Sequence, residues 1–87
     1  MRKRRINWKS IDFPEELDPQ IPKITILGRG DLLLENHIGV LEYTLEQARL
    51  MTGQGMLRVT GEQLQLCELG QDRVYIRGKI DGCTFEE

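Results

Sequence analysis

The sequence predicts an all-β fold, a small antiparallel meander of about seven to eight short strands that packs as a sandwich or a barrel. Two observations indicate this class. Apolar or alternating segments recur at intervals of roughly ten residues from Lys23 onward, and glycine bounds nearly every one of them. Only the segment 44–52 also fits a helical period.

The first three expected strands cover residues 24–27, 32–35 and 40–44. The first ends at Gly28-Arg29-Gly30. The second and third are separated by Asn36-His37-Ile38-Gly39. We interpret this tetrapeptide as the four-residue turn of a β-hairpin, because asparagine and glycine tolerate the positive φ that tight turns require.

The segment 44–52 allows two interpretations. Thr44 and Gln47 fit a helix capping box, with Leu45 and Ala48 on one face of a two-turn helix. Residues 48–52 also alternate as a strand does. Because the surrounding segments are all β, we favour a turn at 44–47 followed by a strand.

The remaining expected strands cover residues 56–60, 63–69, 73–80 and 83–86, with breaks at Gly61-Glu62, Gly70-Gln71-Asp72 and Asp81-Gly82. Alternation places one side of each strand in the core. The inward set is predicted to comprise Leu57, Val59, Leu64, Leu66, Val74, Ile76, Gly78 and Ile80, with Tyr75, Arg77 and Lys79 facing outward. The phase breaks at Cys67-Glu68-Leu69, which predicts a bulge there.

The N-terminal part differs in charge and composition. Residues 1–9 contain five basic and no acidic residues, whereas residues 10–87 contain seven basic and 14 acidic ones, giving +5 and −7. All three prolines, Pro14, Pro19 and Pro22, lie before the first expected strand and favour an extended chain. We therefore divide the chain into a flexible basic arm with linker, 1–22, and a single β-domain, 23–87.

The arm is the one feature whose composition suggests a ligand. Its basic and aromatic side chains would bind an anionic membrane surface or an acidic protein reversibly. These residues are Arg2, Lys3, Arg4, Arg5, Trp8 and Lys9. The alternative is a small nucleic-acid-binding or regulatory module that uses the same arm. Nucleic acid is the weaker expectation, because the acidic body would repel phosphates.

The chain offers no motif for catalysis, a metal or a cofactor, and we expect none of them. Cys67 and Cys83 form no Cys-x-x-Cys pair and are expected to remain reduced, and His37 is the only histidine. The 39% apolar content is too high for a disordered chain. No segment is long and apolar enough to span a bilayer, and we expect no secretory signal.

Two longer motifs carry a resemblance. Residues 21–28, Ile-Pro-Lys-Ile-Thr-Ile-Leu-Gly, are followed by 34–41, Leu-Glu-Asn-His-Ile-Gly-Val-Leu, and the strand pairs at 55–64 and 74–80 follow in the same order. From about Asp12 to Phe85 the chain resembles the YqfC branch of the YabP/YqfC sporulation proteins. Its family-motif turn consists of Glu35, Asn36, His37 and Gly39.

The resemblance implies a non-enzymatic protein of the mother cell in an endospore-forming bacterium, active in spore coat or cortex formation at the forespore surface. It implies no catalytic or cofactor-binding residues. YqfC relatives occur alongside the membrane sporulation protein YqfD, which makes YqfD a candidate partner. Independently, a small core and two unclosed sheet edges would favour a homo-oligomer through edge strands.

Overall fold

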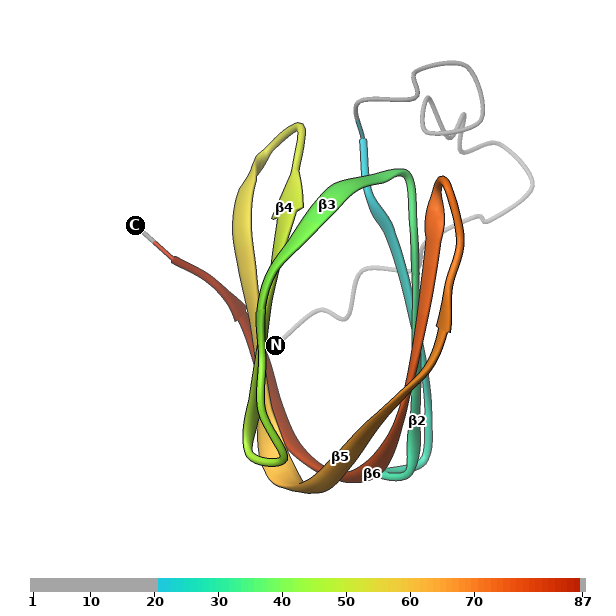
Figure 1. Cartoon of the computed structure of the whole chain (residues 1–87), viewed down its shortest axis with the longest axis vertical. Coiled ribbons are helices and arrows are strands. Elements are labelled where there is room, and N and C mark those ends of the chain that lie inside the picture. The colour runs from blue at the N-terminus through green and yellow to red at the C-terminus, as the bar shows by residue number, and fades with distance from the viewer. Residues whose placement is uncertain (1–20, 87) are drawn as a thin grey trace, which may run out of the picture.

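The computed structural model describes residues 21–86 and contains one six-stranded antiparallel sheet (Figure 1). The strands are β1 (Lys23–Leu27), β2 (Asp31–Glu35), β3 (His37–Tyr43), β4 (Gln47–Thr52), β5 (Gly55–Leu69) and β6 (Arg73–Phe85). Their order is β1-β2-β6-β5-β4-β3. Strands β3 to β6 form a meander, and the β1–β2 hairpin joins it at β6. The all-β antiparallel class predicted from the sequence is confirmed.

The strand count is lower than predicted because β5 and β6 are long and bent. The predicted breaks at Gly61-Glu62 and Asp81-Gly82 lie inside these strands. Both strands continue through these positions, and only the register of the β5–β6 pairing shifts there. A Cβ on Gly61 would collide with the carbonyl oxygen of Lys79. Gly78 has φ +143°, and a Cβ there would lie 2.7 Å from the carbonyl oxygen of Gln63. Glycine therefore allows the two backbones to approach closely at the bend.

The bend folds the sheet over so that its two halves face each other (Figure 1). The β1–β2 half contains β1, β2 and residues 65–69 and 73–77 of the long hairpin. The β3–β4 half contains β3, β4 and residues 55–60 and 82–85. The arrangement is sandwich-like, although one continuous sheet supplies both layers.

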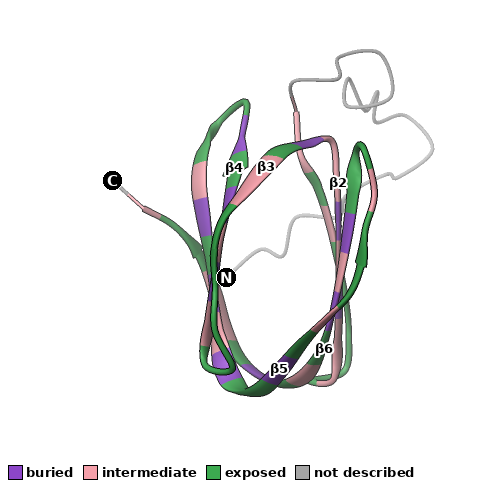
Figure 2. Cartoon of the chain, viewed as in Figure 1, coloured by how far each residue is buried: buried purple, intermediate pink, exposed green. Residues whose placement is uncertain are grey.

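The core is entirely aliphatic. Its buried residues lie on strands of both halves of the sheet (Figure 2). Its buried side chains are Leu32, Leu34, Ala48, Leu50, Leu57, Val59, Leu64, Val74, Ile76 and Ile80. Except across the bend, these positions alternate along β2, β4, β5 and β6. The inward prediction is confirmed for Leu57, Val59, Leu64, Val74, Ile76 and Ile80, whereas Leu66 and Gly78 are only partly buried. The predicted bulge near Cys67 is also present, as a register shift between Leu66 and Glu68.

The hairpin predicted for residues 32–44 is wrong. β2 pairs with β1 and β6, and β3 pairs with β4, so β2 and β3 are not neighbours in the sheet. A single residue, Asn36 with φ +65°, separates the two strands. His37 is already part of β3 because its partner, Thr52, lies on β4.

The preferred interpretation of residues 44–52 is confirmed. Residues 47–52 form β4, and the turn before it is held by Thr44. The Thr44 hydroxyl accepts hydrogen bonds from the backbone N–H groups of Glu46 and Gln47 at 3.1 and 3.0 Å. The same hydroxyl group that suggested a helix cap thus organises a β-turn.

Candidate protein-interaction face

The outer surface of the β1–β2 half contains a row of directly paired residues from four strands. Thr25 of β1 pairs with Leu33 of β2, which pairs with Tyr75 of β6, and Tyr75 also pairs with Glu68 of β5. Leu33 lies between the fully buried Leu32 and Leu34 and therefore faces away from the core. An outward Leu–Tyr pair thus occupies the middle of this face.

Leu33 and Tyr75 line a surface pocket of about 340 Å³. Its apolar lining comes from Leu33 and Leu27, and Leu27 is 67% exposed. The polar lining carries both signs of charge. The lining residues are Thr25, Leu27, Asp31, Leu33, Glu68, Arg73 and Tyr75. An apolar surface with a mixed-charge rim suits a protein segment better than a phosphate or another small anion.

The Tyr75 ring is fixed by its hydroxyl group. This hydroxyl donates a hydrogen bond to the carboxylate of Asp31, and the guanidinium Nε of Arg77 lies 3.3 Å from the same carboxylate. The hydrogen bond to Asp31, followed by partial burial, raises the pKa of Tyr75 above its ordinary value. The pocket therefore presents a neutral, positioned phenol ring, which limits the entropy lost when a partner binds.

The family-motif turn lies at a different place and has a structural role. The Asn36 backbone N–H donates to the carbonyl oxygen of Asp72 at 2.7 Å, and the Asn36 side-chain amide donates to Ile21 O at 3.0 Å. His37 Nε2 lies 3.0 Å from the carbonyl oxygen of Gly70. These contacts tie the β2–β3 corner to the β5–β6 turn and to the chain entering β1.

Within this corner, His37 is 9% exposed and its Nδ1 has no hydrogen-bond partner among residues 21–86. The remaining members of the motif are less involved. Glu35 ends β2 opposite Arg73, and Gly39 lies in β3, where nothing lies within 4 Å of an added Cβ. Neither His37 nor Asn36 lines the pocket.

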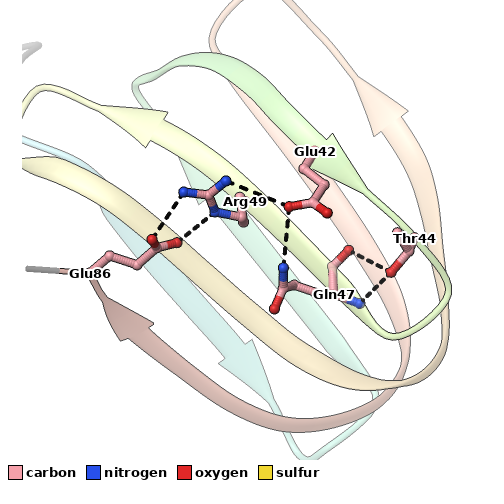
Figure 3. Close-up of polar contacts among 5 residues, drawn as sticks. All are labelled: Glu42, Thr44, Gln47, Arg49 and Glu86. Atoms are coloured by element: carbon pink, nitrogen blue, oxygen red, sulfur yellow. Dashed lines mark hydrogen bonds and ion pairs between the residues drawn. The ribbon is translucent and has the colours of Figure 1, made fainter.

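On the β3–β4 half, Arg49 is the centre of a polar cluster (Figure 3). Its Nε and an Nη bind both carboxylate oxygens of Glu86, at 2.8 and 3.0 Å, and another Nη lies 3.6 Å from Glu42. Hydrogen bonding to Arg49 lowers the pKa of Glu86 and correspondingly raises the pKa of Arg49. The cluster links β3, β4 and the residue after β6. The positive charge of Arg49 is neutralised by the carboxylates of Glu86 and Glu42.

Acidic side chains outnumber basic ones in the described part of the chain. Residues 21–86 contain seven basic and nine acidic side chains. Four of the seven basic groups, those of Arg29, Arg49, Arg77 and Lys79, form ion pairs with carboxylates. Residues 21–86 also contain no cluster of three or more His, Cys, Asp or Glu side chains suited to a metal ion.

The predicted arm residues, Arg2, Lys3, Arg4, Arg5, Trp8 and Lys9, lie outside the described residues. Among residues 21–86, no helix is long and apolar enough to cross a bilayer. Cys67 and Cys83 are both free thiols.

The sequence interpretation missed the pocket, although one signal was present. Three consecutive leucines at 32–34 cannot all face the core of a strand, so the middle one must face outward. Tyr75 was already assigned to an outer face. What the sequence does not reveal is that β2 and β6 are neighbours, which places Leu33 opposite Tyr75.

Comparison with known proteins agrees with the resemblance in the sequence. The model of the YabP family matches residues 19–87. The uncharacterized protein YqfC of Bacillus subtilis (strain 168) is 28% identical over 89 residues, covering 99% of this chain and 96% of that protein. The family match spans nearly the whole β-domain, and the relative extends the similarity over the N-terminal part. The chain therefore belongs to the YabP family, within the sporulation-associated YabP/YqfC group.

Proposed function

We propose that this protein is a non-enzymatic assembly factor of endospore formation. It acts in the mother cell at the forespore surface, in spore coat or cortex formation, and binds a protein partner through the pocket around Leu33 and Tyr75. The observation that carries the proposal is the outward Leu33–Tyr75 pair, fixed in the middle of a four-strand face.

The energetics of the pocket support partner binding. Complete burial of a leucine side chain contributes about 1.5–3 kcal/mol, and an aromatic side chain contributes at least as much. A small patch of this kind, surrounded by polar groups, is typical of the residues that dominate interface affinity. The β-sheet backbone holds Leu33 and Tyr75 in place before any partner arrives, so little ordering is needed on binding.

The arrangement of titratable groups supports a non-catalytic role. The Asp31 carboxylate in the pocket interacts with Tyr75 and Arg77. His37 does not line the pocket, and its Nε2 contacts the carbonyl oxygen of Gly70. A general acid–base mechanism would need such groups to converge on a common substrate position.

The N-terminal arm supplies the second contact of the proposal. Its five basic residues and Trp8 would bind an anionic membrane surface, each charge contributing on the order of 1 kcal/mol. Together the arm and the pocket would bring the protein to the forespore membrane and to a membrane partner, for which YqfD is the candidate. Neither contact alone needs to be strong, because two linked contacts reinforce each other.

Fluorescent fusions in sporulating cells, combined with coprecipitation of tagged YqfD, test this proposal. The wild-type chain should form a rim around the forespore and retain YqfD. Leu33→Lys should lose YqfD, because it removes the central apolar contact and would require a charged side chain to lose its hydration in the interface. The matched control is Met51→Lys, which places the same charge on an exposed outer position of the other half. Circular dichroism checks that both variants fold.

Deletion of residues 1–9 tests the arm separately. A rim that becomes diffuse on deletion supports membrane recruitment by the arm, whereas a rim that survives assigns recruitment to the β-domain alone. Retention of YqfD by Leu33→Lys would overturn the role of the pocket. A diffuse or nucleoid signal for the wild-type chain would contradict the proposed location and favour the nucleic-acid alternative.

A further inference from the structure

Among residues 21–86, two strand edges on one side of the fold have no neighbouring strand. β1 pairs only with β2, and residues 82–85 of β6 pair only with β5. The two edges are connected at one end, where Arg29 O accepts a hydrogen bond from Ile80 N–H at 2.8 Å and the Arg29 guanidinium lies 3.2 Å from Asp81. Beyond that point the described strands form no ladder with each other.

The side chains at these edges face the core side of the sheet. Ile24 and Ile26 pair with the buried Leu34 and Leu32, and Cys83 and Phe85 pair with the buried Val59 and Leu57. Directly paired residues share a face of the sheet. We call these four residues, Ile24, Ile26, Cys83 and Phe85, the apolar seam.

The apolar seam is incompletely covered. Ile26 is 46% exposed and Phe85 is 41% exposed, although both face the core side. Ile24 and Cys83 pack against the core but are only partly buried. Partial burial raises the pKa of the Cys83 thiol. This direction is the one expected for a thiol in apolar surroundings.

Within the described residues, the opposite side of the fold has features that protect its edge, whereas the seam side has none. Register shifts interrupt β3 twice, and the Tyr43 hydroxyl binds the backbone of Leu64 and Leu66 across that side. β1 pairs with β2 without a register shift and contains no proline, so it is a regular edge on which a further strand can pair. We therefore expect another segment to pair with this edge and to cover the exposed apolar side chains beside it.

We propose that residues 11–13 of this chain's own N-terminal segment cover the apolar seam as an additional antiparallel strand on β1. Ile11 and Phe13 alternate with Asp12, so the two apolar side chains would enter the seam while the carboxylate faces water. In the register that suits this pattern, Ile11 lies opposite Ile26 and Phe13 lies opposite Ile24.

The length of the chain outside the described part favours this occupant. Twenty residues precede Ile21, which leads directly into β1. The residues between Phe13 and Ile24 include Pro14, Pro19 and Pro22, which are suited to a reversing loop and not to a strand. A segment tethered this closely has an effective concentration in the millimolar range, well above that of a second copy in solution. This inference does not rest on the proposed function.

The two native thiols provide the test. Cys83 belongs to the seam and Cys67 is exposed at the bulge of β5, so Cys67 is an internal reference in the same molecule. Labelling rates with a maleimide are measured for both thiols by peptide mass spectrometry. The test variant is Ile11→Ser with Phe13→Ser, and the matched control is Leu17→Ser in the expected loop.

In the wild-type chain and in Leu17→Ser, Cys83 should react slowly. In the double variant its rate should increase by about tenfold or more, because removal of the cover abolishes local protection worth at least about 1.4 kcal/mol. The rate of Cys67 should remain unchanged. An unchanged Cys83 rate in the double variant would overturn the proposal, and so would protection that disappears on dilution, because a second copy would then be the cover.

Hydrogen exchange of the unaltered full chain gives an independent readout if the double variant does not fold. Slow exchange of those β1 amides that do not bond to β2 supports the additional strand. Fast exchange of the same amides contradicts it, whatever the labelling shows.

Discussion

The hydroxyl group of Tyr43 donates a hydrogen bond of 2.7 Å to the carbonyl oxygen of Leu64. It also accepts one of 3.3 Å from the backbone N–H of Leu66. Tyr43 ends β3, whereas Leu64 and Leu66 follow the bend in β5, so one side chain joins the two halves of the folded sheet. The tyrosine thereby provides a hydrogen-bond partner for a carbonyl group and an N–H group at the edge of β5, which would otherwise bond to water.

Removal of this hydroxyl should destabilise the fold measurably. For Tyr43→Phe we expect the free energy of unfolding to fall by about 1–2 kcal/mol, because both edge groups lose their partner while the ring remains. Urea denaturation followed by circular dichroism gives the value. Leu41→Ala, an exposed position on the same strand, serves as the control and should change stability by less than about 0.5 kcal/mol. Equal stability of Tyr43→Phe and the wild-type chain would show that the contact contributes nothing.

The bend of the long hairpin depends on Gly78. Alanine at this position would have to adopt φ +143° and place its Cβ 2.7 Å from the carbonyl oxygen of Gln63. We expect a loss of roughly 2–4 kcal/mol from backbone strain and steric conflict, enough to unfold much of a domain this small. Thermal denaturation compares it with Gly39→Ala, whose Cβ would meet no atom within 4 Å. Similar melting temperatures for the two variants would contradict this account of the bend.

Local patterns in the sequence were sufficient for the strand class and the faces. Alternation identified Val74, Ile76 and Ile80 as buried because each strand presents one face to a single core. The turn before β4 was recognised for the same reason, since its polar contacts lie within a few residues of Thr44. Features that depend on neighbours in the sequence were therefore predictable.

Features that depend on residues distant in the sequence could not be predicted. Gly61 and Gly82 were interpreted as turn residues. They lie instead within the bent strands β5 and β6, which pair with each other. Asn36 read as part of a hairpin turn, yet its backbone bonds to Asp72, far along the chain. The pocket requires four strands to meet, and alternation alone contains no information on strand order.

The corner at His37 offers a third prediction. The His37 side chain reaches Gly70 O with Nε2, so Phe at this position would leave that carbonyl group without its partner. We expect His37→Phe to lower the free energy of unfolding by about 1–3 kcal/mol. His37→Gln can place an amide donor near the same position and should lose less. Chemical denaturation of both variants tests the order, and a more stable Phe variant would show that packing outweighs the hydrogen bond.

Alkaline titration tests the Tyr75–Asp31 contact. The carboxylate accepts the phenolic hydrogen bond, which favours the neutral phenol and raises the pKa of Tyr75 above the ordinary value of 10.0. The stability that this contact contributes should be fully present below pH 10.0 and lost as the pH rises through the folded-state pKa. Ultraviolet absorbance of the phenolate, compared with Tyr75→Phe, isolates this group. Asp31→Asn should shift its ionisation to lower pH, and an unchanged titration would exclude Asp31 as the cause.

The Arg49–Glu86 pair should make stability depend on acidic pH. Hydrogen bonding to Arg49 lowers the pKa of Glu86 below its ordinary value of 4.5, so the unfolded chain binds a proton at this group before the folded chain does. The contribution of the pair is therefore present above pH 4.5 and is lost as the pH falls through the folded-state pKa. We expect Glu86→Gln to remove this part of the acid destabilisation, whereas Glu62→Gln, in the more exposed pair with Lys79, should leave it intact. Urea midpoints measured across that pH range compare the three proteins. If Glu86→Gln and the wild-type chain lost stability in parallel, the pair would not be the acid-sensitive contact, and the end of β6 would be held by the sheet alone.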